Sequence, residues 1–290
     1  MSQDADIFEA VVRLRRDGMP AALATIVGTR GSTPGRASMR LLVLEDGTFL
    51  GTVGGGCLES EVYDAALQVL ADEQPRTLTF RLTEKDSPDS GLMCGGEVTI
   101  FVEPVTTPAL WIFGAGHVSK ALCEVAALAG FRVTVVDDRP AFATSERFPQ
   151  AAATLAAPLS EAVANMPIRK NTYCVVVTRG HKEDAVVLQA LAARAANGPS
   201  PRFLGMIGSR TKQAILWKHL RAAGVGDAFL ATVRTPMGSY IGARSHEEIA
   251  VSVVAELIAV RRTGKDQAHT WADRPKKVRL VELRDLPEAQ

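Results

Sequence analysis

Apolar and polar positions recur in two different ways along this chain, and the change between them divides it in two. Up to about residue 105, two helical stripes accompany short alternating segments. The expected helices cover residues 7–18 and the stretch from the glycine run 54–56 to near 70, and the expected strands cover 21–27, 40–44, 48–53, 76–82 and 97–102. Asp46-Gly47 favours a tight hairpin turn between two of these strands. We therefore predict an α+β domain over residues 1–105.

The pattern changes after the proline-bracketed connector Glu103–Pro108. The expected strands now cover 110–113, 133–137, 173–178 and 203–207, and the expected helices cover 116–129, 182–194 and 247–260. Apolar strands alternating with helices are typical of a parallel sheet covered on both faces. We predict an α/β protein whose Rossmann-like doubly wound domain spans residues 108–262, after the smaller α+β domain and before a mostly polar tail over residues 263–290.

Composition and charge restrict the class of protein. The chain has 290 residues, 47% of them hydrophobic, and a mean hydropathy of +0.07, which is enough for two packed domains. Lysine and arginine number 33 against 32 acidic residues, so we expect neither nucleic acid nor a membrane surface as a partner. Four cysteines without a CxxC pair predict neither a disulfide framework nor a metal site. The chain has no basic leader and no apolar run of about 20 residues, so we expect it in the cytoplasm.

Two of the four cysteines stand beside glycine runs, in Gly54-Gly55-Gly56-Cys57 and in Met93-Cys94-Gly95-Gly96. Glycine leaves the backbone open to the close approach of a ligand. Cys57 falls in the first turn of a predicted helix, where unpaired amides and the helix dipole favour a thiolate or a phosphate, although Glu59 and Glu61 would oppose a thiolate. The structural alternative is that the cysteines are small core residues and the glycines only form turns.

The predicted strand ending at Phe113 leads into Gly114-Ala115-Gly116-His117-Val118-Ser119, which has the spacing of a dinucleotide fingerprint with serine at the third small position. Asp137 ends the next predicted strand, 23 residues after Gly114, where an acidic side chain can accept hydrogen bonds from a ribose. This context predicts that Gly114 and Gly116 form a turn that binds a dinucleotide or a related phosphate compound. The alternative is that these glycines only let the strand and helix pack.

Further polar turns are expected at the same edge of the sheet. His117 and His181 each follow a glycine directly after a predicted strand, and open α/β sheets bind ligands where their strands end. Arg179 and Gly180 precede His181, and Gly208-Ser209-Arg210 follows the next strand with an arginine suited to a phosphate. The alternative is that these polar residues only cap the helices that follow.

Taken together, these blocks resemble the XdhC/CoxI family of xanthine dehydrogenase accessory proteins, over nearly the whole chain. The matching segments occur in order: Gly31-Ser32-Thr33-Pro34, Asp46 to Glu59, Met93 to Gly96, Phe113 to Val118, Asp137-Asp138-Arg139, Thr178 to His181, Gly205 to Arg210, Ile241-Gly242-Ala243 and Glu247 to Ser252. Ser38 stands where relatives commonly carry glycine, and Pro236 to Tyr240 departs from the usual run before Ile241.

The resemblance implies a maturation chaperone rather than a turnover enzyme. Such a protein binds molybdenum cofactor as its cargo, supports its sulfuration with a cysteine desulfurase, and delivers it to apo xanthine dehydrogenase; a homodimer is implied as well. Cys57 and Cys94 would then be the reactive thiols, and the glycine-rich turns of both domains would face one common cavity.

Two other functions stay open on the residues alone. One is an NAD(P)-dependent oxidoreductase that uses His117 or His181 as its acid–base group, with Asp137 selecting NAD. The other is a binding module without chemistry, which regulates a partner through the nucleotide that it holds.

Overall fold

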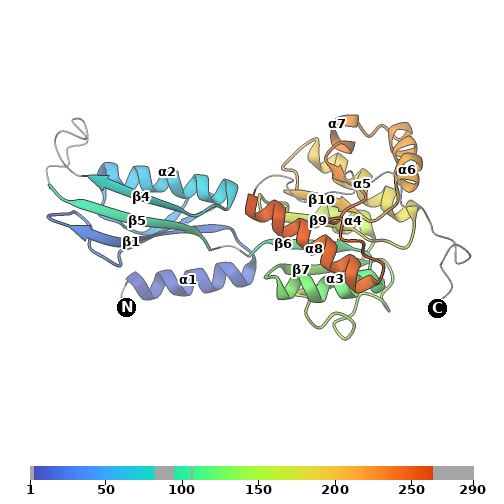
Figure 1. Cartoon of the computed structure of the whole chain (residues 1–290), viewed down its shortest axis with the longest axis horizontal. Coiled ribbons are helices and arrows are strands. Elements are labelled where there is room, and N and C mark those ends of the chain that lie inside the picture. Colours follow the sequence, from blue (N-terminus) through green and yellow to red (C-terminus); the bar gives the residue numbers. More distant parts are fainter. Residues whose placement is uncertain (1–2, 82–94, 106, 264–290) are drawn as a thin grey trace, which may run out of the picture.

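An N-terminal unit built on an antiparallel sheet is joined to a C-terminal unit built on a parallel sheet (Figure 1). The computed structural model describes residues 3–81, 95–105 and 107–263. The parallel sheet has the Rossmann-like order that the alternating pattern predicts, and an α+β unit precedes it. The predicted fold class is therefore confirmed.

The N-terminal unit has five strands in the order β3-β2-β1-β5-β4, with all neighbours antiparallel. The strands are β1 (Ala21–Arg30), β2 (Arg40–Leu44), β3 (Phe49–Gly51), β4 (Arg76–Arg81) and β5 (Glu97–Pro104), and the helices are α1 (Gln3–Asp17) and α2 (Gly56–Asp72). The expected hairpin turn lies between β2 and β3, where Gly47 has a φ of 83° and the Thr48 amide donates to the Asp46 carboxylate at 2.9 Å.

The two helices cover opposite faces of this sheet because β1 alternates its side chains between them. Ala22, Ala24 and Ile26 pack with the buried stripe of α2, whereas Ala21 and Leu23 pack with α1. The helical spacing of Leu58, Val62, Ala66 and Val69 accounts for the buried stripe of α2. The helix predicted after the glycine run is confirmed, and it extends two residues beyond Leu70.

The C-terminal unit has six parallel strands in the order β11-β10-β9-β6-β7-β8. The strands are β6 (Ala109–Phe113), β7 (Arg132–Asp137), β8 (Ala153–Ala156), β9 (Thr172–Val176), β10 (Phe203–Met206) and β11 (Val233–Arg234). The helices are α3 (His117–Leu128), α4 (Leu159–Asn165), α5 (His181–Ala195), α6 (Arg210–Ala222), α7 (Asp227–Leu230) and α8 (His246–Thr263). In this dinucleotide-fold order, the direction of winding reverses between β6 and β9.

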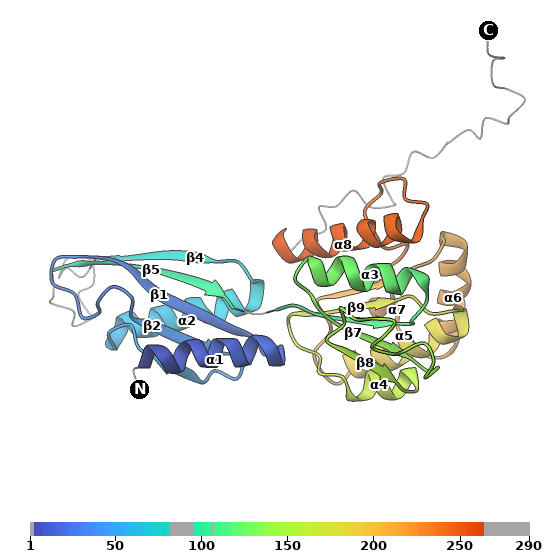
Figure 2. The same cartoon turned by 90° about the horizontal axis from the view of Figure 1, so that it is seen from below.

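Helices α3 and α8 cover one face of the parallel sheet and α4, α5 and α6 cover the other (Figure 2). Cys123 and Cys174 lie in these two cores and are buried. Burial raises the pKa of the Cys123 thiol to about 11 and that of Cys174 further still, so both are structural residues.

The N-terminal unit contacts the C-terminal unit at the amino ends of the parallel strands β6 to β11. Three arginines at these strand starts donate to main-chain oxygens of the N-terminal unit: Arg132 to Arg16 at 3.1 Å, Arg169 to Gly18 at 3.5 Å and Arg202 to Asp72 at 3.2 Å. Arg202 also lies 3.6 Å from the buried Glu73 carboxylate, and burial raises the pKa of Glu73 although nearby arginines oppose the shift. The carboxyl ends of the strands therefore point away from the N-terminal unit.

Candidate functional site

The glycine run before Cys57 forms a turn that only glycine adopts readily. Gly54, Gly55 and Gly56 all have positive φ, at 123°, 76° and 65°. A Cβ at Gly54 would press on the main chain of Pro34 and Gly35, whereas Gly55 and Gly56 face open space. Cys57 follows in the first turn of α2, and its side chain is exposed. The thiol is thus accessible beside an open stretch of backbone, as the sequence predicts.

The Glu59 side chain is hydrogen-bonded to the backbone amides of this turn. Its carboxylate accepts hydrogen bonds from the Val53 amide at 3.1 Å and the Gly55 amide at 3.3 Å, and also from the Thr52 hydroxyl. The chain's own carboxylate therefore already uses amides that an anion would need. This end of α2 suits a thiol site better than the phosphate site that the sequence also allowed.

Two other glycine-containing segments converge on the same end of the N-terminal unit. Ser32 pairs with Gly95 in an isolated bridge, and a Cβ at Gly96 would overlap the Ser32 carbonyl. A Cβ at Gly35 would come within 2.5 Å of the Val53 oxygen. These close approaches account for the glycines in both segments. Cys94, predicted as the second thiol, lies outside the described residues.

At the carboxyl edge of the parallel sheet, the turns after β6 and β9 pack against each other. Gly114 has a φ of 111°, and a Cβ there would overlap the main-chain oxygen of Val177. The predicted residues Gly114, Gly116 and His117 thus stand beside Arg179, Gly180 and His181 at the point where the winding reverses. Gly208, Ser209 and Arg210 follow β10, the next strand outward. Such reversal points are where open α/β sheets bind ligands.

Three of the five helices that follow strands at this edge, α3, α4 and α5, have no side-chain cap. The N-cap residues of α3 and α5 are Gly116 and Gly180, and neither can supply a side-chain acceptor. By contrast, Ser209 accepts from the Lys212 amide at the start of α6, and Ser245 and Glu248 cap each other's amides at the start of α8. At the two helix starts next to the reversal point, the first-turn amides are therefore available to an anion. The capping alternative therefore holds for Ser209 and not for the two glycine turns.

Asp137, predicted to accept hydrogen bonds from a ribose, is hydrogen-bonded within the chain. Its carboxylate accepts from the Ala115 amide at 2.8 Å, and from the Arg139 Nε at 2.8 Å and Nη2 at 2.9 Å. The side chain is only 4% exposed. Burial opposes ionisation, yet the hydrogen bonds from Arg139 and Ala115 outweigh it and hold the pKa of Asp137 below its ordinary value. Asp137 thus anchors the Gly114–Gly116 turn from beneath, and its oxygens are already occupied by the chain.

Asp137→Asn is expected to lower the free energy of unfolding at neutral pH by about 2 kcal/mol, because buried charge-assisted hydrogen bonds are weakened. The folded-state pKa lies below the unfolded value, so the contribution of Asp137 is present above the unfolded pKa and is lost as pH falls through the folded pKa. Urea unfolding at neutral and acid pH should therefore show a shallower acid loss in the variant. Asp138→Asn is the matched control, and equal losses in the two variants would contradict this role.

Several residues at this edge were not predicted. The His117 ring stacks on His246, with centroids 5.5 Å apart. Asp184 is fully buried, and its carboxylate lies 2.5 Å from the Lys212 ammonium and accepts from the Thr178 hydroxyl at 2.6 Å. The sequence carried a signal for Asp184, because this charged residue lies in register with Leu188 and Leu191 on the buried stripe of α5. It carried none for His246, whose neighbour comes from a distant helix.

Cys57 and the Gly114–Gly116 turn lie at opposite ends of the folded molecule. The last turn of α2 reaches the C-terminal unit through Asp72, so the first turn is about 25 Å away along the helix. On the other side, β6 runs about 16 Å away from the junction before it reaches Gly114. Figure 1 shows α2 extending away from the C-terminal unit. The prediction that both face one common cavity is therefore wrong for a single chain.

The matching family models divide the chain in the same order as its two sheets. The XdhC Rossmann domain matches residues 110–257, and the XdhC and CoxI family matches residues 14–81. This chain belongs to the XdhC/CoxI family. Cys57 lies in the range 14–81, and the Gly114–Gly116 turn lies in the range 110–257. Ser38 has a φ of 74°, a conformation that glycine adopts more readily than serine.

Three relatives of this XdhC/CoxI member extend over most of it. It is 32% identical to the uncharacterised protein YqeB of Escherichia coli K12 over 96% of the chain, but it spans only 50% of YqeB. It is 25% identical to a protein of Bacillus subtilis 168 described as a probable subunit of xanthine dehydrogenase, over 86% of the chain and 96% of that protein. It is 27% identical to the molybdenum cofactor insertion chaperone PaoD of E. coli K12, over 88% of each.

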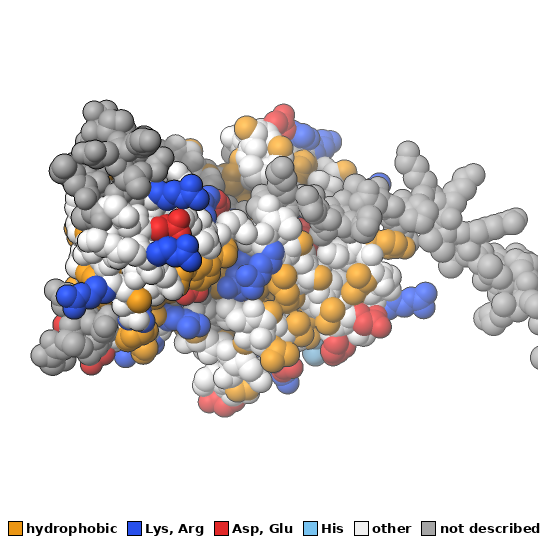
Figure 3. Space-filling model, turned by 60° about the vertical axis from the view of Figure 1, so that its left-hand side comes forward, with side chains coloured by type: hydrophobic (Ala, Val, Ile, Leu, Met, Phe, Trp, Pro, Cys, Tyr) orange, Lys and Arg blue, Asp and Glu red, His pale blue; other side chains and the backbone are white. Residues whose placement is uncertain are grey.

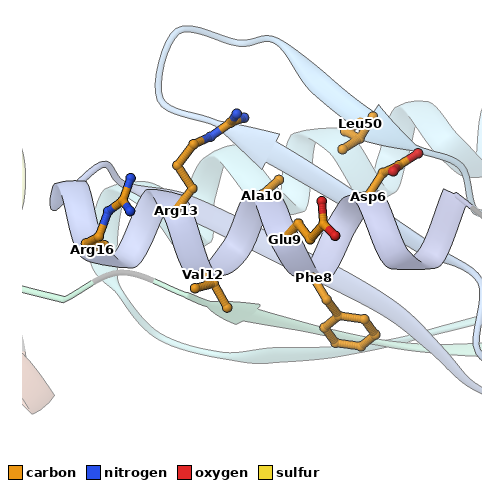
Figure 4. A pocket seen from close by; sticks show the side chains of 8 residues that line it. All are labelled: Asp6, Phe8, Glu9, Ala10, Val12, Arg13, Arg16 and Leu50. Carbon is orange, nitrogen blue, oxygen red and sulfur yellow. The ribbon is translucent and has the colours of Figure 1, made fainter. Parts of the chain in front are cut away.

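A pocket elsewhere on the described part of the chain is lined by none of the predicted site residues. A groove of about 730 Å³ runs along α1, where Phe8 and Val12 point to the opposite side of the helix from Leu50 (Figure 4). Basic and acidic side chains are interspersed over the face in Figure 3. Within the described ranges, His, Cys, Asp and Glu form no group of three that could hold a metal ion, and no helix is long and apolar enough to cross a membrane.

Proposed function

We propose that this protein is a cytoplasmic chaperone that binds molybdenum cofactor and supplies it to apo xanthine dehydrogenase. The observation that carries the proposal is the pair of uncapped helix starts at Gly116 and Gly180, on the two sides of the reversal point. The cofactor ends in a phosphate, and converging backbone amides are a general way to bind one. Membership of the XdhC/CoxI family and the likeness to PaoD support this cargo over other phosphate compounds.

The residues at the carboxyl edge have separate tasks in this proposal. The amides after Gly116 and Gly180 hold the phosphate, and Arg179 supplies a charged, planar donor. His117 and His181 stand at the starts of the two uncapped helices, where their side chains border the ligand. Ser209 and Arg210 border the same edge one strand further out. Asp137 keeps the glycine turn in shape from below.

The thiol end has the second task. Cys57, together with Cys94, takes part in the sulfuration of the cofactor with a cysteine desulfurase. Because Cys57 and the Gly114–Gly116 turn lie at opposite ends of one chain, two copies must combine to present both to one cofactor. We propose a homodimer in which the N-terminal unit of one copy faces the carboxyl edge of the other, since symmetric pairs are the commonest oligomers.

Cofactor content tests the proposal. The protein is purified from cells that make molybdenum cofactor, and its pterin and molybdenum are assayed. We expect near-stoichiometric amounts in the natural chain and about a tenfold loss in Gly180→Ala, whose added methyl group would stand among the ligand-binding amides. Gly226→Ala is the control, because Gly226 is also an N-cap glycine but begins α7; a Cβ at Gly180 would lie 3.1 Å from the Glu183 carboxylate, and one at Gly226 would meet nothing within 4 Å. A natural chain without cofactor, or equal losses in both variants, would contradict the proposal.

An NAD(P)-dependent oxidoreductase is the second candidate, favoured by the strand order and the glycine spacing. The internal hydrogen bonds of Asp137 count against a ribose there, because Ala115 and Arg139 already donate to its carboxylate. Calorimetric titration with NAD and NADP separates the two functions, since micromolar binding would support the oxidoreductase.

A further inference from the structure

An ion pair crosses the carboxyl edge of the sheet directly beside the glycine turn. The Arg179 guanidinium donates to the Asp138 carboxylate through two parallel bonds of 2.8 and 2.9 Å, and its Nε donates to Glu183 at 3.1 Å. Asp138 follows β7 and Arg179 follows β9, and β6 lies between these two strands. The pair therefore bridges the end of β6, where the chain turns through Gly114 and Gly116.

The turn that follows β9 packs against the Gly114–Gly116 turn, and this packing places the Arg179–Asp138 ion pair at the proposed ligand site. A Cβ at Gly114 would overlap the Val177 oxygen, and Arg179 is only two residues further along the chain. Its guanidinium is thus held within the region where the amides of α3 and α5 converge. Arg147, whose Nη2 donates to the Ala115 oxygen at 3.3 Å, and Arg179 are thus cations beside this turn, and Arg179 is already paired with a carboxylate.

We propose that Asp138 competes with the phosphate of the ligand for Arg179, and so determines which ligands the site accepts. The Arg179 and Asp138 side chains are 41% and 36% exposed, so the bond between them is worth little and can be exchanged. A phosphate matches the guanidinium fork as well as a carboxylate does and carries more charge. A ligand without a phosphate leaves the pair intact and gains nothing from Arg179. The inference rests on the proposed site but not on the identity of the cargo.

Because Arg179 and Asp138 carry opposite charges, removing one or the other should change the affinity for a phosphate ligand in opposite directions. To test this, inorganic pyrophosphate is titrated into each variant by calorimetry at one fixed ionic strength. Arg179→Ala should weaken binding by about tenfold or more, because a charge-assisted bidentate contact is lost. Asp138→Asn should tighten binding about three- to fivefold, because Arg179 no longer has to be released. Asp227→Asn is the matched control: it removes the same charge from the exposed Arg221–Asp227 pair between α6 and α7 and should change nothing.

A double variant separates competition from simple repulsion. If Asp138 acts by holding Arg179, Asp138→Asn should have no effect in the Arg179→Ala background. A gain that persists there would show that the carboxylate only repels the ligand, and the proposal would be overturned. It would also be overturned if no form of the protein bound pyrophosphate at millimolar concentration. If the pyrophosphate titrations show this competition but the purified protein holds no molybdenum cofactor, the inference stands and the proposed cargo is wrong.

Discussion

Gly114→Ala is expected to lower the free energy of unfolding by about 3–5 kcal/mol, whereas Gly116→Ala should leave it nearly unchanged. The two positions lie two residues apart in one turn but have different surroundings. Gly114 has a φ of 111°, and a Cβ there would overlap the Val177 main chain. Gly116 has a φ of −80°, which any residue adopts, and nothing lies within 4 Å of its added Cβ.

The Gly116→Ala variant also tests whether the ligand occupies the open space beside Gly116. Gly116→Ala should fold like the natural chain and still lose about tenfold or more in cofactor content, because its methyl group would stand where a phosphate meets the α3 amides. Urea unfolding measures the first property and pterin assay the second. A Gly116→Ala protein with full cofactor content would show that the ligand does not use this turn.

A crosslink between Cys57 and the carboxyl edge should form between two copies and not within one. In the variant His117→Cys, a short bismaleimide should yield a covalent dimer in which the peptide holding Cys57 is joined to the peptide holding position 117. The two positions lie at opposite ends of a single chain, so only a second copy can bring them together. Cys57→Ser should abolish this crosslink and lower the maturation of apo xanthine dehydrogenase by about tenfold or more.

The control for this experiment is Leu128→Cys, which places a thiol at the opposite end of α3 from His117. Leu128 is 89% exposed, so its reactivity with maleimide should be high. Mass spectrometry should find no peptide that joins Cys57 to position 128. A crosslink of equal yield at both positions would indicate random collision, and none at position 117 would contradict a shared site in the dimer.

The regular elements with strong periodicity were predictable, and the weak ones were not. The apolar runs of β6, β7, β9 and β10 and the stripes of α2, α3, α5 and α8 appear at nearly the expected residues. β8 is a half-exposed edge strand of four residues and β11 has only two, so neither leaves an apolar run. α6 buries only Leu216, Trp217 and Leu220, which is too narrow a stripe to stand out among its basic and polar residues.

The candidate site was predictable in its turns but not in its hydrogen bonds. Glycine spacing after a strand indicates a turn, because the backbone conformation is a local property. It cannot show that Asp137 bonds to Arg139 and Ala115, that Arg179 spans β6 to Asp138, or that His246 stacks on His117. Each of these contacts joins side chains to groups that share no local periodicity with them, and the strand order alone places them together.

The sequence by itself determined the family, the two kinds of sheet, and the positions of the glycine turns. Only the tertiary structure decided which edge of the parallel sheet meets the N-terminal unit. Arg132, Arg169 and Arg202 make that choice by donating to main-chain oxygens far away in the chain. Local patterns report how a segment folds, whereas the docking of two units depends on surfaces that exist only once both have folded, and this docking separates Cys57 from the Gly114–Gly116 turn.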